Sequence, residues 1–157
     1  KLNLKKYFVK TKFYGVGLNK KAIKKSIYKM QPFNGSIYFY YGDFEDFLRE
    51  IHGKIDEVEE ASIKTKGFEN SLGLTTYAGN SSYIFISREH NTNLHILLGS
   101  IVHEIMHAIF HTLDCAGYNY NTEGQELYCY YHNSVLESVL NQLDLINTHT
   151  KYIEENK

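Results

Sequence analysis

The apolar and polar positions in the first part of the chain form short blocks. An imperfect period of two predicts a strand in the first part of residues 4–17. Apolar residues at helical spacing then predict a helix over 18–30, with Asn19 as its cap. Turn residues fill 31–35, and the aromatic run at 36–41 has the length and composition of a strand. This part is therefore predicted to fold as strand, helix and strand.

The middle of the chain combines a helix, a poorly patterned stretch and a hairpin. An aspartate after a glycine opens a short amphipathic helix over 43–53. Residues 54–72 are charged and lack a clear period, which predicts a loop with a weak strand at its start. Two strand-like runs within 72–87 flank Gly79-Asn80, a pair typical of a hairpin turn. The second of these runs is the stronger strand.

Two long helices complete the pattern. The first starts near Asn93 and runs to about residue 113, and Gly117 and Asn119 break it. A capping-box pattern at Thr122 opens the second helix, which runs to about residue 147. The elements together predict one α+β domain, in which a small mixed or antiparallel sheet packs on two long C-terminal helices.

The length of 157 residues suits a single domain over residues 1–157. Within it, residues 1–72 form an N-terminal part without an assigned role, and residues 73–147 hold the hairpin and both long helices. The net charge of −1 gives no electrostatic reason to expect nucleic acid or an anionic membrane as a partner. Cys115 and Cys129 are too few for a disulfide scaffold, so we expect free thiols.

The same composition bears on location. No apolar run approaches the roughly 20 residues that span a bilayer. The N-terminus is charged but lacks the apolar core of a secretory signal. We therefore expect a cytoplasmic protein.

The pattern His103-Glu104-x-x-His107 lies in the first long helix. Residues four apart share a helix face, so both imidazoles can aim at one point. Zinc accepts imidazole nitrogen at about 2.0–2.1 Å in a tetrahedral shell. Glu104 is displaced around the helix, where it can take a proton from a water in the open position as that water attacks a carbonyl. The motif predicts zinc-dependent hydrolysis, although imidazole and carboxylate also suit other divalent ions.

A structural alternative stays open for the same residues. The motif helix is apolar nearly all round, which is typical of a buried helix. Two histidines and a glutamate inside such a helix cost free energy unless something satisfies them. A zinc ion would do so, and so would a buried hydrogen-bond network without metal.

Three residues compete to be the third metal ligand. His111 lies one further turn along the same helix, so a supporting position beside the ligands is favoured for it. Glu123 and Glu126 lie at the start of the second helix, which can return a carboxylate to the metal. Glu123 falls in the first turn, where an acidic residue also suits the helix dipole. Glu126, one turn deeper beside apolar residues, is the preferred ligand.

The order His103-Glu104-x-x-His107 followed by Glu126 resembles the gluzincin metallopeptidases, whose third ligand is a glutamate on the next helix. Roughly residues 74–140 also resemble small metallopeptidase-like proteins of phages and prophages, with a strand before the motif and a Glu-x-x-x-Tyr segment after it. The resemblance implies a zincin-like fold and a peptide or protein substrate. It also implies zinc held by both histidines and Glu126, with Glu104 as the catalytic residue.

The resemblance further assigns residues around the ligands. Gluzincins carry an acidic residue one turn after the third ligand, and Tyr130 stands there in this chain; we expect Tyr130 and His111 beside the ligand set. In such enzymes the strand next to the motif helix is an exposed sheet edge to which an extended peptide adds. The residues expected to form this edge, or otherwise a core strand, are Tyr83, Ile84, Phe85, Ile86 and Ser87. The candidate oxyanion donors are Tyr118, Tyr120, Tyr128, Tyr130 and Tyr131.

The predicted function is thus a zinc-dependent hydrolase that cleaves peptide bonds. Two alternatives retain the metal. One is a phage or prophage regulatory or host-interaction protein that cleaves a single partner. The other is a binding module in which zinc staples the two long helices without catalysis. That module would need a fourth protein ligand, such as His111 or Cys115, because structural zinc sites are closed.

Overall fold

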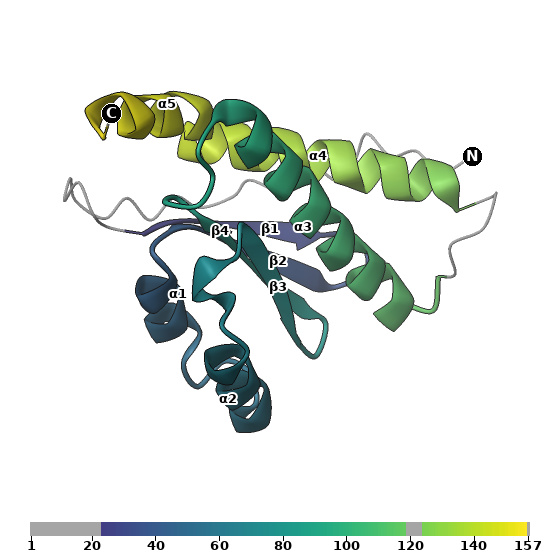
Figure 1. Ribbon diagram of the computed structural model, residues 1–157. Helices are drawn as coiled ribbons and strands as arrows, with labels where there is room; N and C mark the ends of the chain where they lie inside the picture. The colour runs from purple at the N-terminus through teal and green to yellow at the C-terminus, as the bar shows by residue number, and fades with distance from the viewer. Residues whose placement is uncertain (1–22, 119–123, 157) are drawn as a thin grey trace.

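The computed structural model describes residues 23–118 and 124–156, and the structural statements below concern these residues. Four strands form one sheet in the order β1-β2-β4-β3 (Figure 1). The strands are β1 (Lys24–Met30), β2 (Gly35–Gly42), β3 (Gly73–Ala78) and β4 (Ser81–Ser87). β2 runs parallel to β4, and the other two pairings are antiparallel. The sheet is therefore mixed, and strands from both parts of the chain share it.

Helices cover both faces of this sheet. They are α1 (Phe44–Ile51), α2 (Glu57–Thr65), α3 (Leu94–Cys115), α4 (Gln125–Leu143) and α5 (Leu145–Glu155), with a short 3-10 helix, η2, over Phe68–Asn70. The α1 and α2 helices lie on one side of the sheet, and α3 and α4 lie on the other (Figure 1). The fold is α+β, as the sequence predicted.

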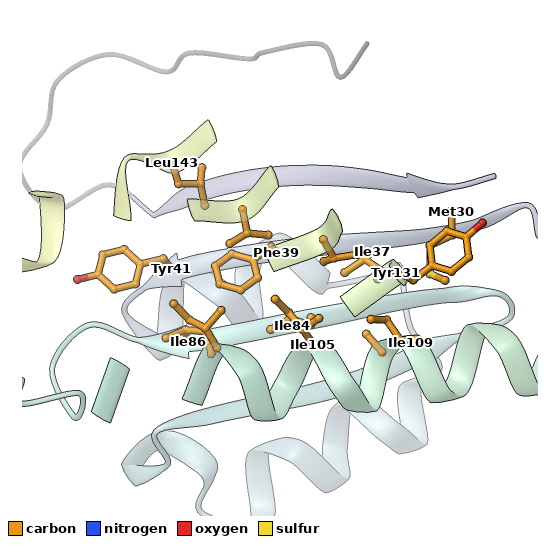
Figure 2. Close-up of a cluster of buried hydrophobic side chains, with 14 of the residues drawn as sticks. Met30, Ile37, Phe39, Tyr41, Ile84, Ile86, Ile105, Ile109, Tyr131 and Leu143 are labelled. Atoms are coloured by element: carbon orange, nitrogen blue, oxygen red, sulfur yellow. The ribbon is translucent and has the colours of Figure 1, made fainter. Parts of the chain in front are cut away.

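Two hydrophobic cores follow from the alternation of side chains along β2 and β4. Ile37, Phe39 and Tyr41 point toward α3 and α4, where Ile105 and other isoleucines of α3 meet them (Figure 2). The intervening aromatic residues pack with α1 and α2 on the other face. Strands covered on both faces are expected to be apolar along their whole length, and these two are.

Several predicted elements are confirmed. β2 and α1 occupy the ranges predicted for a strand at 36–41 and a helix at 43–53. The hairpin within 72–87 is formed by β3 and β4. The motif helix is α3, and the Asn93 side chain caps it by accepting a hydrogen bond from the Ile96 amide at 3.0 Å.

Two predictions for the N-terminal part are wrong. Part of the helix expected at 18–30 is β1, because pairing with β2 over its whole length outweighs a helical spacing made of few apolar residues. The weak strand expected at the start of 54–72 is instead α2. Its N-terminus is capped by Asp56, whose carboxylate accepts hydrogen bonds from the amides of Val58 and Glu59. The strand predicted within 4–17 lies outside the described residues.

The C-terminal helix also differs from its prediction. α4 begins at Gln125, and the predicted cap Thr122 lies outside the described residues. The helix expected to continue to about residue 147 ends at Leu143. Asp144 adopts a left-handed conformation with φ 46°, and α5 starts at the next residue. One predicted helix is therefore two.

One described helix, α3, is long and apolar enough to cross a membrane by length and composition, contrary to the expectation that no apolar run reaches this length. Nine of its residues are buried. They include Ile101, Ile105 and Ile109, which belong to the core between α3, α4 and the sheet. The central helix of a soluble protein meets the same criterion, and this packing agrees with a soluble protein.

Candidate functional site

The two histidines of the motif point at one place on the surface of α3. Their Nε2 atoms lie 3.1 Å apart, and their rings meet edge to face with centroids 4.7 Å apart. Two nitrogens that share a tetrahedral zinc ion with bonds of about 2.0–2.1 Å are about 3.3–3.4 Å apart. His103 and His107 thus offer a bidentate pair with nearly the spacing that such an ion requires.

The surroundings of this pair differ from the expected buried helix. Both histidines are exposed. Val102 and Phe110 are exposed too, with 38% and 37% of their surface accessible to solvent. The reason is that α3 rests with one side on the sheet, and α4 covers only part of the other side. A buried hydrogen-bond network therefore does not account for the histidines, because solvent can satisfy both rings.

Glu104 is the buried member of the motif, with 8% of its surface exposed. Its Oε2 accepts a hydrogen bond of 2.6 Å from the Thr75 hydroxyl of β3. Gly73, two residues earlier on the same face of β3, leaves room for it: a Cβ there would lie 2.9 Å from Glu104 Cγ and 3.2 Å from its Oε1. The hairpin thus fixes this carboxylate, which directly follows His103 along α3.

His111 lies one turn further along α3, at the β3–β4 turn. Its Nε2 donates a hydrogen bond of 2.8 Å to the Gly79 carbonyl. The ring stacks on Tyr77 with centroids 4.1 Å apart, and Cys115 Sγ lies 3.6 Å from Nε2. His111 is therefore bound to the turn and to its own neighbours rather than joined to the histidine pair.

Glu126, the preferred third ligand, differs from its prediction in burial. Glu126 is exposed and falls in the first turn of α4, so the prediction that it occupies a buried register is wrong. Successive helical residues turn by about 100°, which places Glu126 about 120° around α4 from His132. The His132 ring faces α3, with Nε2 3.4 Å from the Val102 carbonyl. The burial prediction failed because α4 starts two residues later than the capping box indicates.

The remaining candidates complete this picture. Glu123 lies outside the described residues. Tyr130 is half-buried against the core, with its ring 5.3 Å from Tyr131, and is about 160° around α4 from His132. Within residues 23–118 and 124–156, no three His, Cys, Asp or Glu side chains come together in a group that could hold a metal. The described geometry therefore provides two ligands and a neighbouring carboxylate.

The predicted substrate edge at residues 83–87 is not an edge. β4 pairs with β2 on one side and with β3 on the other, and all five of these residues are buried. The edge strand next to α3 is β3, which pairs only with β4 among the described strands. The stronger apolar pattern of β4 reflects its central position, since an edge strand needs fewer apolar residues.

Residues that the sequence analysis missed lie on β3. Gly73, Thr75 and Tyr77 alternate along the strand and share the face that meets Glu104 and His111. Burial raises the pKa of Tyr77, and the charge of Glu104 raises it further, so its hydroxyl stays protonated. The period of two in the first half of the hairpin could have identified them as neighbours of the motif helix.

Among the predicted oxyanion donors, two hydroxyls already have backbone partners. Tyr128 donates to the Tyr118 carbonyl at 3.3 Å, and Tyr131 donates to the Gln31 carbonyl. Tyr118 is 46% exposed, and Tyr120 lies outside the described residues. The charge of Glu104 raises the pKa of Tyr77, which is not one of these predicted donors.

Comparisons with known proteins add no family to this picture. A scan against protein-family models, a search of curated proteins and a search of solved structures each found no match to the chain.

Proposed function

We propose that the protein is a zinc-dependent hydrolase that cleaves peptide bonds in the cytoplasm. The observation that carries the proposal is the convergence of His103 and His107, with Nε2 atoms 3.1 Å apart, on the helix that also carries the buried Glu104. Imidazole pairs with this spacing suit zinc, and a nearby carboxylate suits proton transfer. The resemblance of the motif to gluzincins supports the same function.

In this proposal His103 and His107 hold the zinc, and Glu126 or Glu123 contributes a carboxylate. Bound zinc supplies acidity, since it lowers the pKa of a coordinated water from about 15.7 toward 7. Glu104 accepts the proton of the attacking water and returns it to the leaving amine. The Thr75 hydroxyl, 2.6 Å from Oε2, keeps the carboxylate oriented during both transfers.

The substrate is proposed to bind as an extended strand along β3. The edge of β3 that no other described strand covers offers backbone groups for pairing, and Thr75 on this strand contacts Glu104. This role moves from residues 83–87, where the sequence placed it, to residues 73–78.

Zinc content measured by elemental mass spectrometry tests the metal site. We expect His103→Ala and His107→Ala each to lose one equivalent of zinc per chain, and Glu104→Gln to keep it. His95→Ala is a matched control, since His95 is also exposed on α3 but lies two turns before His103. Equal zinc content in wild type and His103→Ala would overturn the proposal. Loss in Glu126→Ala or in Glu123→Ala would identify the third ligand.

Hydrolysis of a mixed peptide library tests the chemistry. Zinc-loaded wild type should cleave it, and Glu104→Gln should cleave about 10²–10⁴-fold more slowly while keeping its metal. A zinc-loaded wild type that cleaves no library peptide would favour the alternatives: a protease for one partner of phage or host, or a non-catalytic zinc-bound module.

A further inference from the structure

A second pair of metal-binding side chains follows the first along α3. The four residues His103, His107, His111 and Cys115 are spaced four apart, so that each lies about one turn beyond the last. His103 and His107 contact each other, and His111 and Cys115 contact each other. The proposed hydrolytic site uses only the first pair.

The imidazole of His111 is oriented for ligation. The Gly79 carbonyl can only accept a hydrogen bond, so the 2.8 Å contact places a hydrogen on Nε2 and leaves the lone pair on Nδ1. Metal-binding histidines usually donate their other ring N–H to a carbonyl or carboxylate in this way. The Tyr77 ring, stacked at 4.1 Å with an interplanar angle of 26°, holds the imidazole from a second side.

The Cys115 thiol stands beside this ring and is accessible. Its Sγ lies 4.0 Å from Nδ1 and 3.6 Å from Nε2, and Cys115 is a free, exposed cysteine. A nitrogen and a sulfur that share a tetrahedral zinc ion, with bonds of about 2.0–2.1 and 2.3 Å, are about 3.6 Å apart. Sγ now lies closer to Nε2 than to Nδ1, so metal binding requires the cysteine side chain to change rotamer toward the Nδ1 side of the ring.

We propose that His111, through Nδ1, and Cys115, as a thiolate, form a second bidentate site for zinc or a similar divalent transition metal. Binding releases the thiol proton to solvent, and water fills the remaining coordination positions. Thiolate and imidazole together favour such ions over calcium or magnesium. The proposal does not depend on hydrolysis. It adds a site at the β3–β4 turn that lies outside the motif His103-Glu104-x-x-His107.

Cobalt(II) titration of the reduced full-length protein tests this site, because thiolate ligation gives a sulfur-to-cobalt charge-transfer band that histidine ligation does not give. We expect the band in wild type and its loss in Cys115→Ser. Cys129→Ser is the matched control, since Cys129 is the other exposed free cysteine, and it should keep the band. His111→Ala should raise the apparent Kd for the band at least tenfold, and His103→Ala should leave it unchanged.

The opposite outcomes overturn the proposal. Absence of the band in wild type, or its persistence in Cys115→Ser, would show that Cys115 binds no metal. Loss of the band in His103→Ala would show one joint site instead of two. Circular dichroism of each metal-free variant checks the fold, and Cys115→Ala gives a second substitution if serine perturbs it. Failure of the hydrolase proposal would appear separately, as zinc content unchanged by His103→Ala.

Discussion

Both sides of α3 carry apolar residues, but the two sides have different environments in the structure. The inner side, with Ile101, Ile105 and Ile109, has no exposed surface and packs on the sheet (Figure 2). The outer side combines exposed apolar residues such as Val102 with the exposed pair His103 and His107. Glu104 lies at the boundary, buried against β3.

This difference teaches that an apolar helix need not be buried all round. The inner side supplies stability, because apolar surface removed from water is the main favourable term in folding. The outer side can carry polar chemistry at little cost, since water solvates the histidines. Substitutions on the inner side of α3 should therefore change stability most, and substitutions on its outer side should change it least.

Removing a side chain from the inner side should have the largest effect. Ile105→Ala deletes a fully buried side chain and should lower the free energy of unfolding by about 2–5 kcal/mol, because it leaves a cavity between α3 and the sheet. Val102→Ala on the outer side is the control, with an expected change within about 0.5 kcal/mol. Urea unfolding measures both. Similar losses in the two variants would contradict the division.

A methyl group at the boundary should have an intermediate effect. Gly73→Ala places a Cβ 2.9 Å from Glu104 Cγ and 3.1 Å from Ile86 Cδ1, so we expect a loss of about 1–3 kcal/mol. Gly99→Ala is the matched control within α3, where nothing lies within 4 Å of the added Cβ. It should stabilise the helix by about 0.5–1 kcal/mol.

A double-mutant cycle locates the cause of the Gly73→Ala loss. If the clash is with Glu104, the loss should shrink in a Glu104→Ala background. An unchanged loss in that background would assign the clash to Ile86 instead.

The histidines also differ in burial: His103 and His107 are exposed, and His149 is buried. His149 of α5 is fully buried, and its Nδ1 lies 2.7 Å from the Tyr41 hydroxyl. Burial lowers the pKa of His149, an effect that the nearby backbone of Asn91 only partly offsets. The unfolded chain therefore binds a proton at this histidine more readily than the folded chain does. As the pH is lowered below about 6.5, the free energy of unfolding decreases by at most about 1.4 kcal/mol per pH unit.

The contribution of His149 can be isolated by substitution. Tyr41 and Tyr152 contact its ring, and Arg88 and Asp43 interact in turn with Tyr41. His149→Gln keeps these groups and removes the titration, so its unfolding free energy should depend less on pH between about pH 5 and 7. The same pH dependence in wild type and His149→Gln would refute the prediction.

Substitution of an outer histidine should have the smallest effect on the metal-free protein. His103→Ala should change the free energy of unfolding by no more than about 0.5 kcal/mol. With zinc at a hundred times the dissociation constant of the His103–His107 site, wild type should gain about 2.7 kcal/mol more than His103→Ala gains. Thermal unfolding with and without zinc measures the difference, and an equal gain in both proteins would contradict the site.

The fold could be predicted best where local pattern and tertiary environment agree. The hairpin has a turn pair that specifies its geometry, and α3 has a cap and a long apolar run. β1 and α2 were mispredicted because their sequences are charged and weakly patterned. Other contacts stabilise these two elements: β2 pairs with β1 along its whole length, and Asp56 caps α2.

The candidate site divides in a similar way. The convergence of His103 and His107 follows from helix geometry alone, because both ligands lie on one rigid element. The contacts of Glu104 with β3 join residues about 30 positions apart, and local spacing carries no information about such distances. The sequence analysis proposed β4 as the edge strand for the same reason. Whether a strand lies at the edge or in the centre of a sheet depends on the strand order, which local spacing does not reveal.

The sequence by itself determined the α+β class, the motif helix and the four-residue spacing of its possible ligands, because these follow from local periodicity. Only the tertiary structure decided which side of α3 is solvent-exposed and that β3 is the strand beside Glu104. It also decided that His111 turns its Nε2 to Gly79 and faces Cys115. The physical reason is that burial and strand order arise from contacts between distant segments, which no single window of sequence contains.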